Sequence, residues 1–180
     1  FWFVGRWLIH RVIAVTREGK RFANEGNSYH DFVQDLVKSA RPGEEIAAFL
    51  VCDHHTLRKY GLGCVPPFPM PLGHHLKTGY LKRGANLAGL AREAGIDAKG
   101  LEATVAAFNK NAAEGRDPDF GKGSRAYNRY QGDAQHGPNP CVAPIEHGPF
   151  YAVKVVPGSF ATFAGLRTDR NAHVLNASGN

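Results

Sequence analysis

Apolar runs of strand length, set apart by turn residues, constrain the fold of this chain more than any other feature. Residues 12–16 are β-branched and apolar, residues 46–51 form a continuous apolar run, and residues 150–156 form a third. Each run has the length and composition of a strand. Weaker strand patterns follow at residues 160–167 and 172–175. Helical patterns lie between the runs, so the sequence predicts an α+β fold.

One helix is predicted over residues 28–40. Ser28 has the side chain of a helix N-cap, and Asp31 lies near the positive end of the helix dipole. An apolar face repeats at helical spacing, through Phe32, Val33, Leu36 and Val37. Pro42-Gly43 stops the pattern.

Two further helices are predicted around the link Gly95-Ile96-Asp97. Asn86 caps the first, and Asp97 caps the second, which we expect to end at Gly115. Residues 61–72 are rich in proline and glycine, and residues 115–148 in Gly, Pro, Asp and Asn. We expect loops in both stretches.

Composition narrows the classes of protein. The net charge is +6, but the basic residues are scattered, which argues against nucleic-acid binding. The sequence contains no run of about 18 apolar residues, so it predicts no membrane span. Three cysteines without close spacing indicate reduced thiols and a cytoplasmic protein. The chain opens at Phe1 without Met, which suits a fragment.

The nine histidines do not predict a metal site. His54-His55 and His74-His75 are adjacent pairs, whereas zinc ligands recur at helical or knuckle-like spacings. No Gly-x-Ser-x-Gly elbow indicates a serine nucleophile, and the cysteines lack a recognisable catalytic context. We therefore expect no metal ion and no nucleophilic triad.

Residues 17–20 have turn composition, so the strand at residues 12–16 is predicted to run into a hairpin. The block Arg21-Phe22-Ala23-Asn24-Glu25 combines a base, an aromatic residue and an acid at the end of that hairpin. From the residues alone, it indicates an ion pair between Arg21 and Glu25 that braces the hairpin against the following helix. A role at a functional site is the alternative.

Two blocks carry a resemblance to a known family. The first block is residues 19–30, which begin Gly19-Lys20-Arg21-Phe22-Ala23-Asn24-Glu25. The second block is residues 149–169, which include Phe160-Ala161-Thr162-Phe163-Ala164-Gly165. Together they resemble the substrate-capping half of FAD-dependent dehydrogenases in the fumarate reductase, succinate dehydrogenase and 3-ketosteroid dehydrogenase superfamily. The resemblance covers nearly the whole chain.

The resemblance leaves one motif out. Such enzymes hold the FAD diphosphate with a Gly-x-Gly-x-x-Gly turn, and the Gly-x-Gly triplets here are Gly61-Leu62-Gly63 and Gly121-Lys122-Gly123. Neither follows a clear strand and opens a helix. The resemblance implies a linker at residues 1–14, a capping domain at 15–148 and a partial return to the FAD domain at 149–180. FAD would be bound by the full-length enzyme and not retained by this chain.

The resemblance also points to a branch of the superfamily. Where dicarboxylate enzymes place an arginine, four residues after the glutamate of the first block, this chain has Tyr29. Where those enzymes have a His-x-Thr-x-Gly-Gly stretch, residues 160–165 lack the histidine. Both differences remove positive charge that would hold a carboxylate. They favour the 3-ketosteroid dehydrogenase branch, and the segment Asp119-Phe120-Gly121-Lys122-Gly123 resembles it too.

Site roles follow from the resemblance. Tyr29 is the expected acid or base in desaturating a carbon–carbon bond beside a ketone. Tyr151, Phe160 and Thr162 are expected to contact an apolar ketone or steroid-like substrate, and Asn24, Glu25 and Gly165 to contact the cofactor. The remainder of the FAD-binding domain is the implied partner.

Alternatives remain for these roles. Tyr151 has an alternative as a core aromatic residue, and residues 119–123 as a surface loop. For the whole chain, the alternatives are a dicarboxylate oxidoreductase and a non-catalytic binding domain that reuses the cap.

Overall fold

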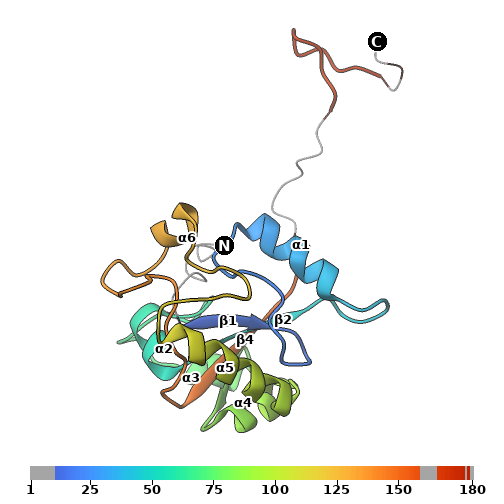
Figure 1. The fold of residues 1–180 in the computed structure, drawn as a ribbon. Helices are drawn as coiled ribbons and strands as arrows, with labels where there is room; N and C mark the ends of the chain where they lie inside the picture. The colour runs from blue at the N-terminus through green and yellow to red at the C-terminus, as the bar shows by residue number, and fades with distance from the viewer. Residues whose placement is uncertain (1–10, 159–165, 177, 179–180) are drawn as a thin grey trace.

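The centre of the molecule is a four-stranded antiparallel sheet (Figure 1). A computed structural model of the chain describes residues 11–158, 166–176 and 178. The strands lie in the order β1-β2-β4-β3, with bounds Val12–Val15, Ala48–Cys52, Phe150–Val155 and Leu81–Gly84. The fold is therefore mixed α+β, as the sequence predicts.

Both faces of the sheet are covered. Alternate residues of each strand point to opposite faces. Ile13 lies opposite Val51 on one face, and Ala14 lies opposite Leu50 on the other. Because helices pack on both sides, β1 and β2 are buried along their whole length and read as continuous apolar runs.

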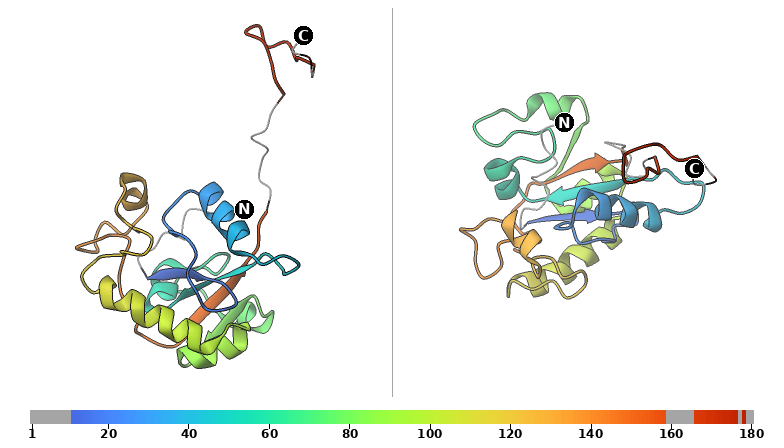
Figure 2. Two further views of the ribbon diagram at one scale, coloured as in Figure 1. Left: turned by 45° about the vertical axis from the view of Figure 1, so that its right-hand side comes forward. Right: turned by 90° about the horizontal axis from the view of Figure 1, so that it is seen from above.

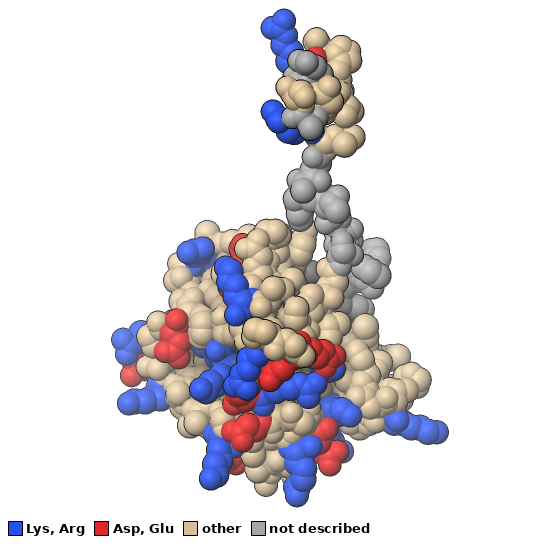
Figure 3. Space-filling model, turned by 90° about the vertical axis from the view of Figure 1, so that its right-hand side faces the viewer, with Lys and Arg blue, Asp and Glu red and all other residues tan. Residues whose placement is uncertain are grey.

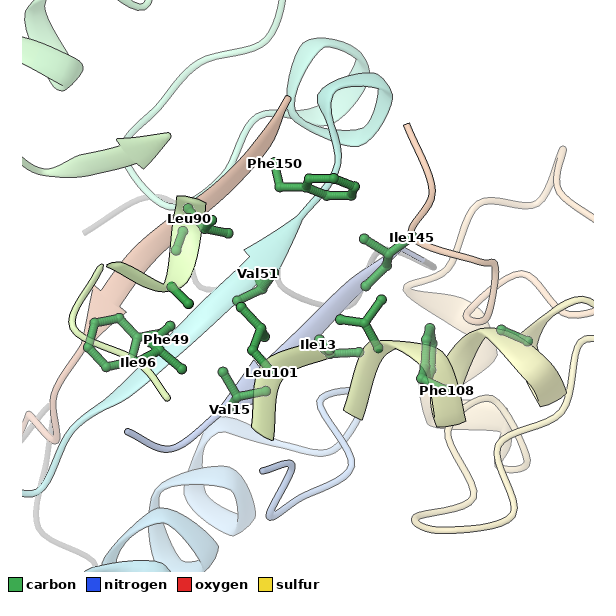
Figure 4. Packing of buried hydrophobic residues seen from close by; sticks show 14 of the residues in the cluster. Ile13, Val15, Phe49, Val51, Leu90, Ile96, Leu101, Phe108, Ile145 and Phe150 are labelled. Carbon is green, nitrogen blue, oxygen red and sulfur yellow. The ribbon is translucent and has the colours of Figure 1, made fainter. Parts of the chain in front are cut away.

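Helices α4 (Leu87–Ala94) and α5 (Ala98–Ala112) cover one face. Figure 4 shows the packing there: the α5 side chains face β1 and β2, and Leu90 of α4 lies near β2 and β4. This cluster includes Ile13, Val15, Phe49, Val51, Leu101, Val105, Phe108, Ile145 and Phe150.

The opposite face lies under α1 (Tyr29–Ser39) and α2 (His54–Tyr60). In Figure 1 and in the turned views of Figure 2, α1 lies across the sheet from α4 and α5. Phe32 of α1 and Leu57 of α2 share a buried cluster with Tyr151 of β4. Two short helices complete the fold, α3 (Gly73–Lys77) and α6 (Ala126–Tyr130).

The turn after β1 packs directly against the start of α5. Gly19 has a φ of 71°, and a Cβ atom there would lie 2.2 Å from the Leu101 nitrogen. A Cβ atom on Gly100 would lie 1.9 Å from the Glu18 carbonyl oxygen. Both positions therefore require glycine. The backbone amide of Asp97 also donates to the Arg17 carbonyl at 2.7 Å, so this turn is fixed to the helical layer.

Several local predictions are confirmed. Ser28 accepts a hydrogen bond from the Asp31 amide at the start of α1. Asn86 and Asp97 cap α4 and α5 through their side chains, and Gly95 ends α4 in the left-handed conformation. These signals are local in sequence, which is why a pattern finds them.

Other boundaries differ from the prediction. The second strand is Ala48–Cys52, two residues later at its start than expected. Helix α5 ends at Ala112, before Gly115. Helix α2 was not predicted: His54-His55 lie in its first turn, where the buried Asp53 side chain accepts the Thr56 amide at 2.9 Å. Strand β3 was also missed, since its solvent-facing residues Lys82 and Arg83 hide the strand pattern.

The predicted strand at residues 172–175 is wrong. A tight turn occupies this stretch, with only a bridge between Thr168 and Val174. The Asp169 carboxylate accepts the amides of Asn171 and His173, and Ala172 adopts a φ of 64°. An aspartate that binds its own following backbone competes with a strand ladder. Of the strand predicted at 160–167, residues 160–165 lie outside the described residues.

Strand β4 bears on the predicted division at residue 149. It lies between β2 and β3, at the centre of the sheet. The segment from residue 149 onward, which was expected to return to the FAD domain, therefore supplies a central strand to the same sheet as β1, β2 and β3. The division into residues 1–14, 15–148 and 149–180 otherwise stays a prediction.

The surface shows mixed charge. On the face seen in Figure 3, described Lys and Arg side chains are interspersed with Asp and Glu. Among the described residues, no helix is long and apolar enough to cross a membrane.

Candidate functional site

A buried network of four charged side chains lies beside β1. Arg21 donates through Nε and Nη2 to the Glu25 carboxylate at 2.9 and 2.8 Å. The same guanidinium donates to Asp117 at 2.7 and 3.0 Å. The side chains of Arg21, Glu25 and Asp117 are only 4%, 1% and 2% exposed. The ion pair expected between Arg21 and Glu25 is thus present, and Asp117 extends it.

Lys122 completes this network. Its side chain is fully buried, donates to the Val12 carbonyl at 2.5 Å and lies 3.5 Å from Glu25. The rings of Phe108 and Phe120 lie 5.0 and 4.8 Å from the Arg21 guanidinium. Two positive and two negative groups leave the network neutral.

The electrostatics follow from this enclosure. Burial by itself would raise the pKa of Glu25, but the charges of Arg21 and Lys122 outweigh it and lower that pKa to about 2. Burial lowers the pKa of Lys122, and Glu25 opposes the change. The network therefore holds charge that is paired within the protein.

Asn24 and Glu25, the expected cofactor contacts, lie inside this region. Asn24 donates to the Phe120 carbonyl at 3.1 Å and to Asn128 at 3.2 Å, and accepts the Gly26 amide at 2.8 Å. Glu25 also accepts the Ala14 amide at 3.0 Å. Both side chains are engaged by the protein, and their contact with a cofactor stays a prediction.

Tyr29 is the first residue of α1 and is 44% exposed. It follows the Ser28 cap, five residues after Asn24 in the chain. An 11-residue helix places its positive end at this position. The prediction that Tyr29 lies in the first turn is confirmed, whereas its catalytic role stays a prediction.

Tyr151 lies on β4. The residue is 1% exposed and packs in the cluster under α1 and α2. Its hydroxyl lies 3.0 Å from Nδ1 of His54 in α2. Burial raises the pKa of Tyr151, while the charges of Arg83 and Arg58 oppose the rise. Tyr151 is thus a core aromatic residue with a polar end, and its contact with substrate stays a prediction.

A depression of about 480 Å³ adjoins this pair. Its volume is in the range of small-molecule sites, ~300–1,000 Å³. Imidazoles and cations line it, through His54, His55, Arg58, Lys59 and His147, with Gly148. We call it the α2 pocket.

The α2 pocket was not predicted from the sequence, because its paired histidines were expected on a strand or coil. The available signal was Asp53, an N-cap residue followed by Leu57 four positions later. Asp117 and Lys122 were likewise not predicted to meet Arg21. Phe160, Thr162 and Gly165 lie outside the described residues.

Neither Gly-x-Gly triplet forms a dinucleotide-binding turn. Gly61 ends α2 with a φ of 79°, and Leu62 bridges to Val65. Gly121 and Gly123 lie in coil around the buried Lys122. In the part of the chain that the structure describes, no strand–glycine turn–helix cradle for a diphosphate is present. Nor do three or more His, Cys, Asp or Glu side chains gather there to hold a metal ion.

These features define a class: an α+β domain with a partly exposed tyrosine on a helix start, a pocket of cationic and imidazole groups, and no described nucleotide cradle. Comparison with known proteins adds the family. The model of the FAD binding domain family matches residues 9–180, and the chain belongs to this family.

Relatives of known activity extend the comparison. The chain is 45% identical over 168 residues to 4-oxocyclohex-2-ene-1-carboxylate 5-dehydrogenase of Sinomonas cyclohexanicum, covering 93% of this chain and 28% of the relative. It is similar to the structure of 3-ketosteroid delta1-dehydrogenase from Sterolibacterium denitrificans in complex with 1,4-androstadiene-3,17-dione. That match has a TM-score of 0.90 and 35% identity, over 98% of this chain and 32% of the other.

A third likeness concerns the fold alone. The solution structure of a fumarate reductase flavoprotein subunit from Lactobacillus plantarum matches with a TM-score of 0.60 and 22% identity, over 89% of this chain and 92% of that one. A chain of nearly this extent has thus been solved by itself. The present chain spans under a third of the length of the two relatives above.

Proposed function

We propose that this chain is the substrate-capping part of an FAD-dependent dehydrogenase that desaturates a carbon–carbon bond beside a ketone. Tyr29 is the proposed acid or base. The observation that carries the proposal is its placement: 44% exposed on the first turn of α1, directly after a block whose charges are paired inside the protein. The two relatives named above, which act on ketone-bearing rings according to their names, support the reaction class.

The chemistry of Tyr29 follows from its position. Desaturation removes two hydrogens from adjacent carbons, one of them as a proton beside the ketone. A phenol can take up or return a proton at its oxygen. The positive end of α1 favours negative character on a group in its first turn. The buried network that includes Arg21 and Glu25, shortly before Tyr29 in the chain, pairs its charges internally and adds no net charge.

The cofactor belongs to the complete protein. FAD supplies the redox chemistry in such enzymes, accepting the two electrons and the second hydrogen. The described residues offer no diphosphate cradle, so the rest of the FAD domain would hold it. We propose accordingly that the chain alone retains little FAD. Purified chain should be colourless, and a stoichiometric flavin absorbance after gel filtration would contradict this.

The substrate is proposed to be a cyclic ketone. Tyr29 stands where dicarboxylate enzymes carry an arginine, which removes one cation for holding a dicarboxylate. One of these relatives is named for a small cyclic keto acid, and the other is a ketosteroid dehydrogenase in complex with a steroid dione. A dicarboxylate oxidoreductase is the alternative that the likeness in fold leaves open.

Replacing Tyr29 tests the proposal. In the complete flavoprotein, Tyr29→Phe should lower the rate of flavin reduction by a cyclic ketone about 10²- to 10⁴-fold, the range for a lost acid–base group. Tyr130→Phe is the matched control, because Tyr130 is 88% exposed on α6.

Stopped-flow absorbance of the flavin measures both rates. Equal rates for Tyr29→Phe and the parent would refute the catalytic role. Flavin reduction by succinate and not by a cyclic ketone would favour the dicarboxylate alternative.

A further inference from the structure

We propose that the α2 pocket binds the carboxylate group of a small organic acid. The first reason is its lining. Arg58 and Lys59 supply fixed positive charge, and His54, His55 and His147 supply imidazole groups. Among the described residues that line the pocket, none is acidic.

Other depressions show that this lining is distinctive. The one beside Asn139 includes Asp117 along with Arg116 and Lys122. The one beside Leu36 includes three glutamates, Glu18, Glu44 and Glu45. Their charges are mixed or acidic, so an anion gains less there.

The second reason is that Arg58 is held in place without being saturated. Its Nη1 donates to the Met70 carbonyl at 2.9 Å, and its guanidinium lies 5.0 Å from the Phe68 ring centre. A guanidinium has five N–H donors. Among the described residues, Nη1 makes the only hydrogen bond recorded for this side chain. Donors therefore remain for a ligand, and a carboxylate matches their planar geometry.

Lys59 contributes less than Arg58. Its Nζ donates to Asp133 at 2.9 Å, and the Tyr60 hydroxyl donates to the same carboxylate oxygen. Part of its charge is thus compensated, which leaves Arg58 as the main fixed cation of the pocket.

The third reason is the pair formed by Tyr151 and His54. The Tyr151 hydroxyl lies 3.0 Å from Nδ1 of His54, and the two rings stack with centroids 5.9 Å apart. One ring nitrogen of His54 is thereby engaged within the protein, so Nε2 is the polar atom that this ring can present to a ligand. Tyr151 acts as a positioning residue for the pocket.

The molecule that carries the carboxylate is a separate question from whether the pocket binds a carboxylate. A cyclic keto acid supplies both a ketone and a carboxylate, and this source rests on the proposed function. The affinity of the pocket for a carboxylate does not depend on flavin chemistry. The two can therefore be tested apart.

The binding experiment uses the isotope-labelled chain and nuclear magnetic resonance. Cyclohexanecarboxylate should shift the imidazole resonances of His54, His55 and His147, and cyclohexanone at equal concentration should not. Arg58→Gln should weaken binding about ten- to a hundredfold, the range for a lost hydrogen bond to a charged group. Arg92→Gln, on an exposed position of α4, is the matched control and should leave affinity unchanged.

Two variants guard against a folding artefact. His55→Ala changes an exposed side chain and should also weaken binding, with the amide spectrum otherwise preserved. Tyr151→Phe removes the hydroxyl beside Nδ1 of His54 and should change the ¹⁵N shifts of His54 before any ligand is added.

Several results would overturn the inference. Unmoved histidine resonances, equal weakening by Arg92→Gln, or equally strong shifts from inorganic phosphate would each do so. If cyclohexanecarboxylate fails to bind while a cyclic ketone still reduces the flavin of the complete protein, the pocket assignment fails and the proposed function stands. If cyclohexanecarboxylate binds to the pocket but no cyclic ketone reduces the flavin, the pocket assignment stands and the proposed function fails.

Discussion

The two charged regions of this molecule differ in whether their polar groups already have partners. In the network of Arg21, Glu25, Asp117 and Lys122, every charge faces an opposite charge and almost no surface is exposed. In the α2 pocket, Arg58 retains donors and the lining is open to solvent. Removing one member of a fully paired buried network leaves an uncompensated charge and destabilises the fold, whereas partly satisfied cations at a surface are available to a ligand.

Removing one partner of the network should give the largest effect on stability. Arg21→Met leaves two carboxylates buried beside a single lysine, and we expect the free energy of unfolding to fall by about 3–5 kcal/mol. Arg58→Met is the control from the pocket, with an expected change below about 1 kcal/mol. Urea unfolding of the chain measures both. Similar losses for the two variants would erase the distinction between the regions.

The second-largest effect on the free energy of unfolding is expected when acid protonates Glu25. The pKa of Glu25 is lowered from 4.5 to about 2 in the folded state. A carboxyl group with a lowered pKa in the folded state stabilises the protein at pH values above its pKa in the unfolded state. This stabilisation is lost as the pH falls from about 4.5 to about 2. The shift corresponds to about 3 kcal/mol.

Glu25→Gln isolates that contribution. The parent should be more stable than the variant near neutral pH, and the difference should narrow steadily as the pH approaches 2. Unfolding midpoints in urea across this range measure the difference. A constant difference would show that Glu25 does not titrate with folding.

The smallest effect is expected at the pair that adjoins the pocket. Tyr151→Phe keeps the buried ring and removes one hydrogen bond to His54, so a loss of about 1 kcal/mol is expected. Tyr130→Phe, on a fully solvated ring, should change stability by less than about 0.5 kcal/mol. A loss of 3 kcal/mol or more for Tyr151→Phe would place this pair with the buried network instead.

The sequence predicted the local parts of the fold well. Ser28, Asn86 and Asp97 cap helices where the patterns indicated, and the runs at residues 12–16 and 150–156 are strands β1 and β4. It missed α2, because adjacent histidines carry no helical signature, and it placed a strand at residues 172–175 where Asp169 binds its own backbone.

The candidate site was predicted unevenly. The resemblance identified the block before α1 and led to Tyr29, which lies in the first turn as expected. It also marked Asn24 and Glu25, whose polar atoms the protein itself engages. Nothing in the sequence pointed to Arg58, since a single arginine beside paired histidines has no motif.

By itself, the sequence determined β1, β4, α1, α4 and α5 and their apolar faces, because those signals depend on neighbours within one or two turns. Only the tertiary structure decided which polar groups meet. Arg21 reaches Asp117 across 96 residues, and Tyr151 reaches His54 across 97. The second contact depends on the pairing of β4 with β2, in which Tyr151 lies opposite Cys52. Strand order and loop closure set such meetings, and no local pattern encodes them.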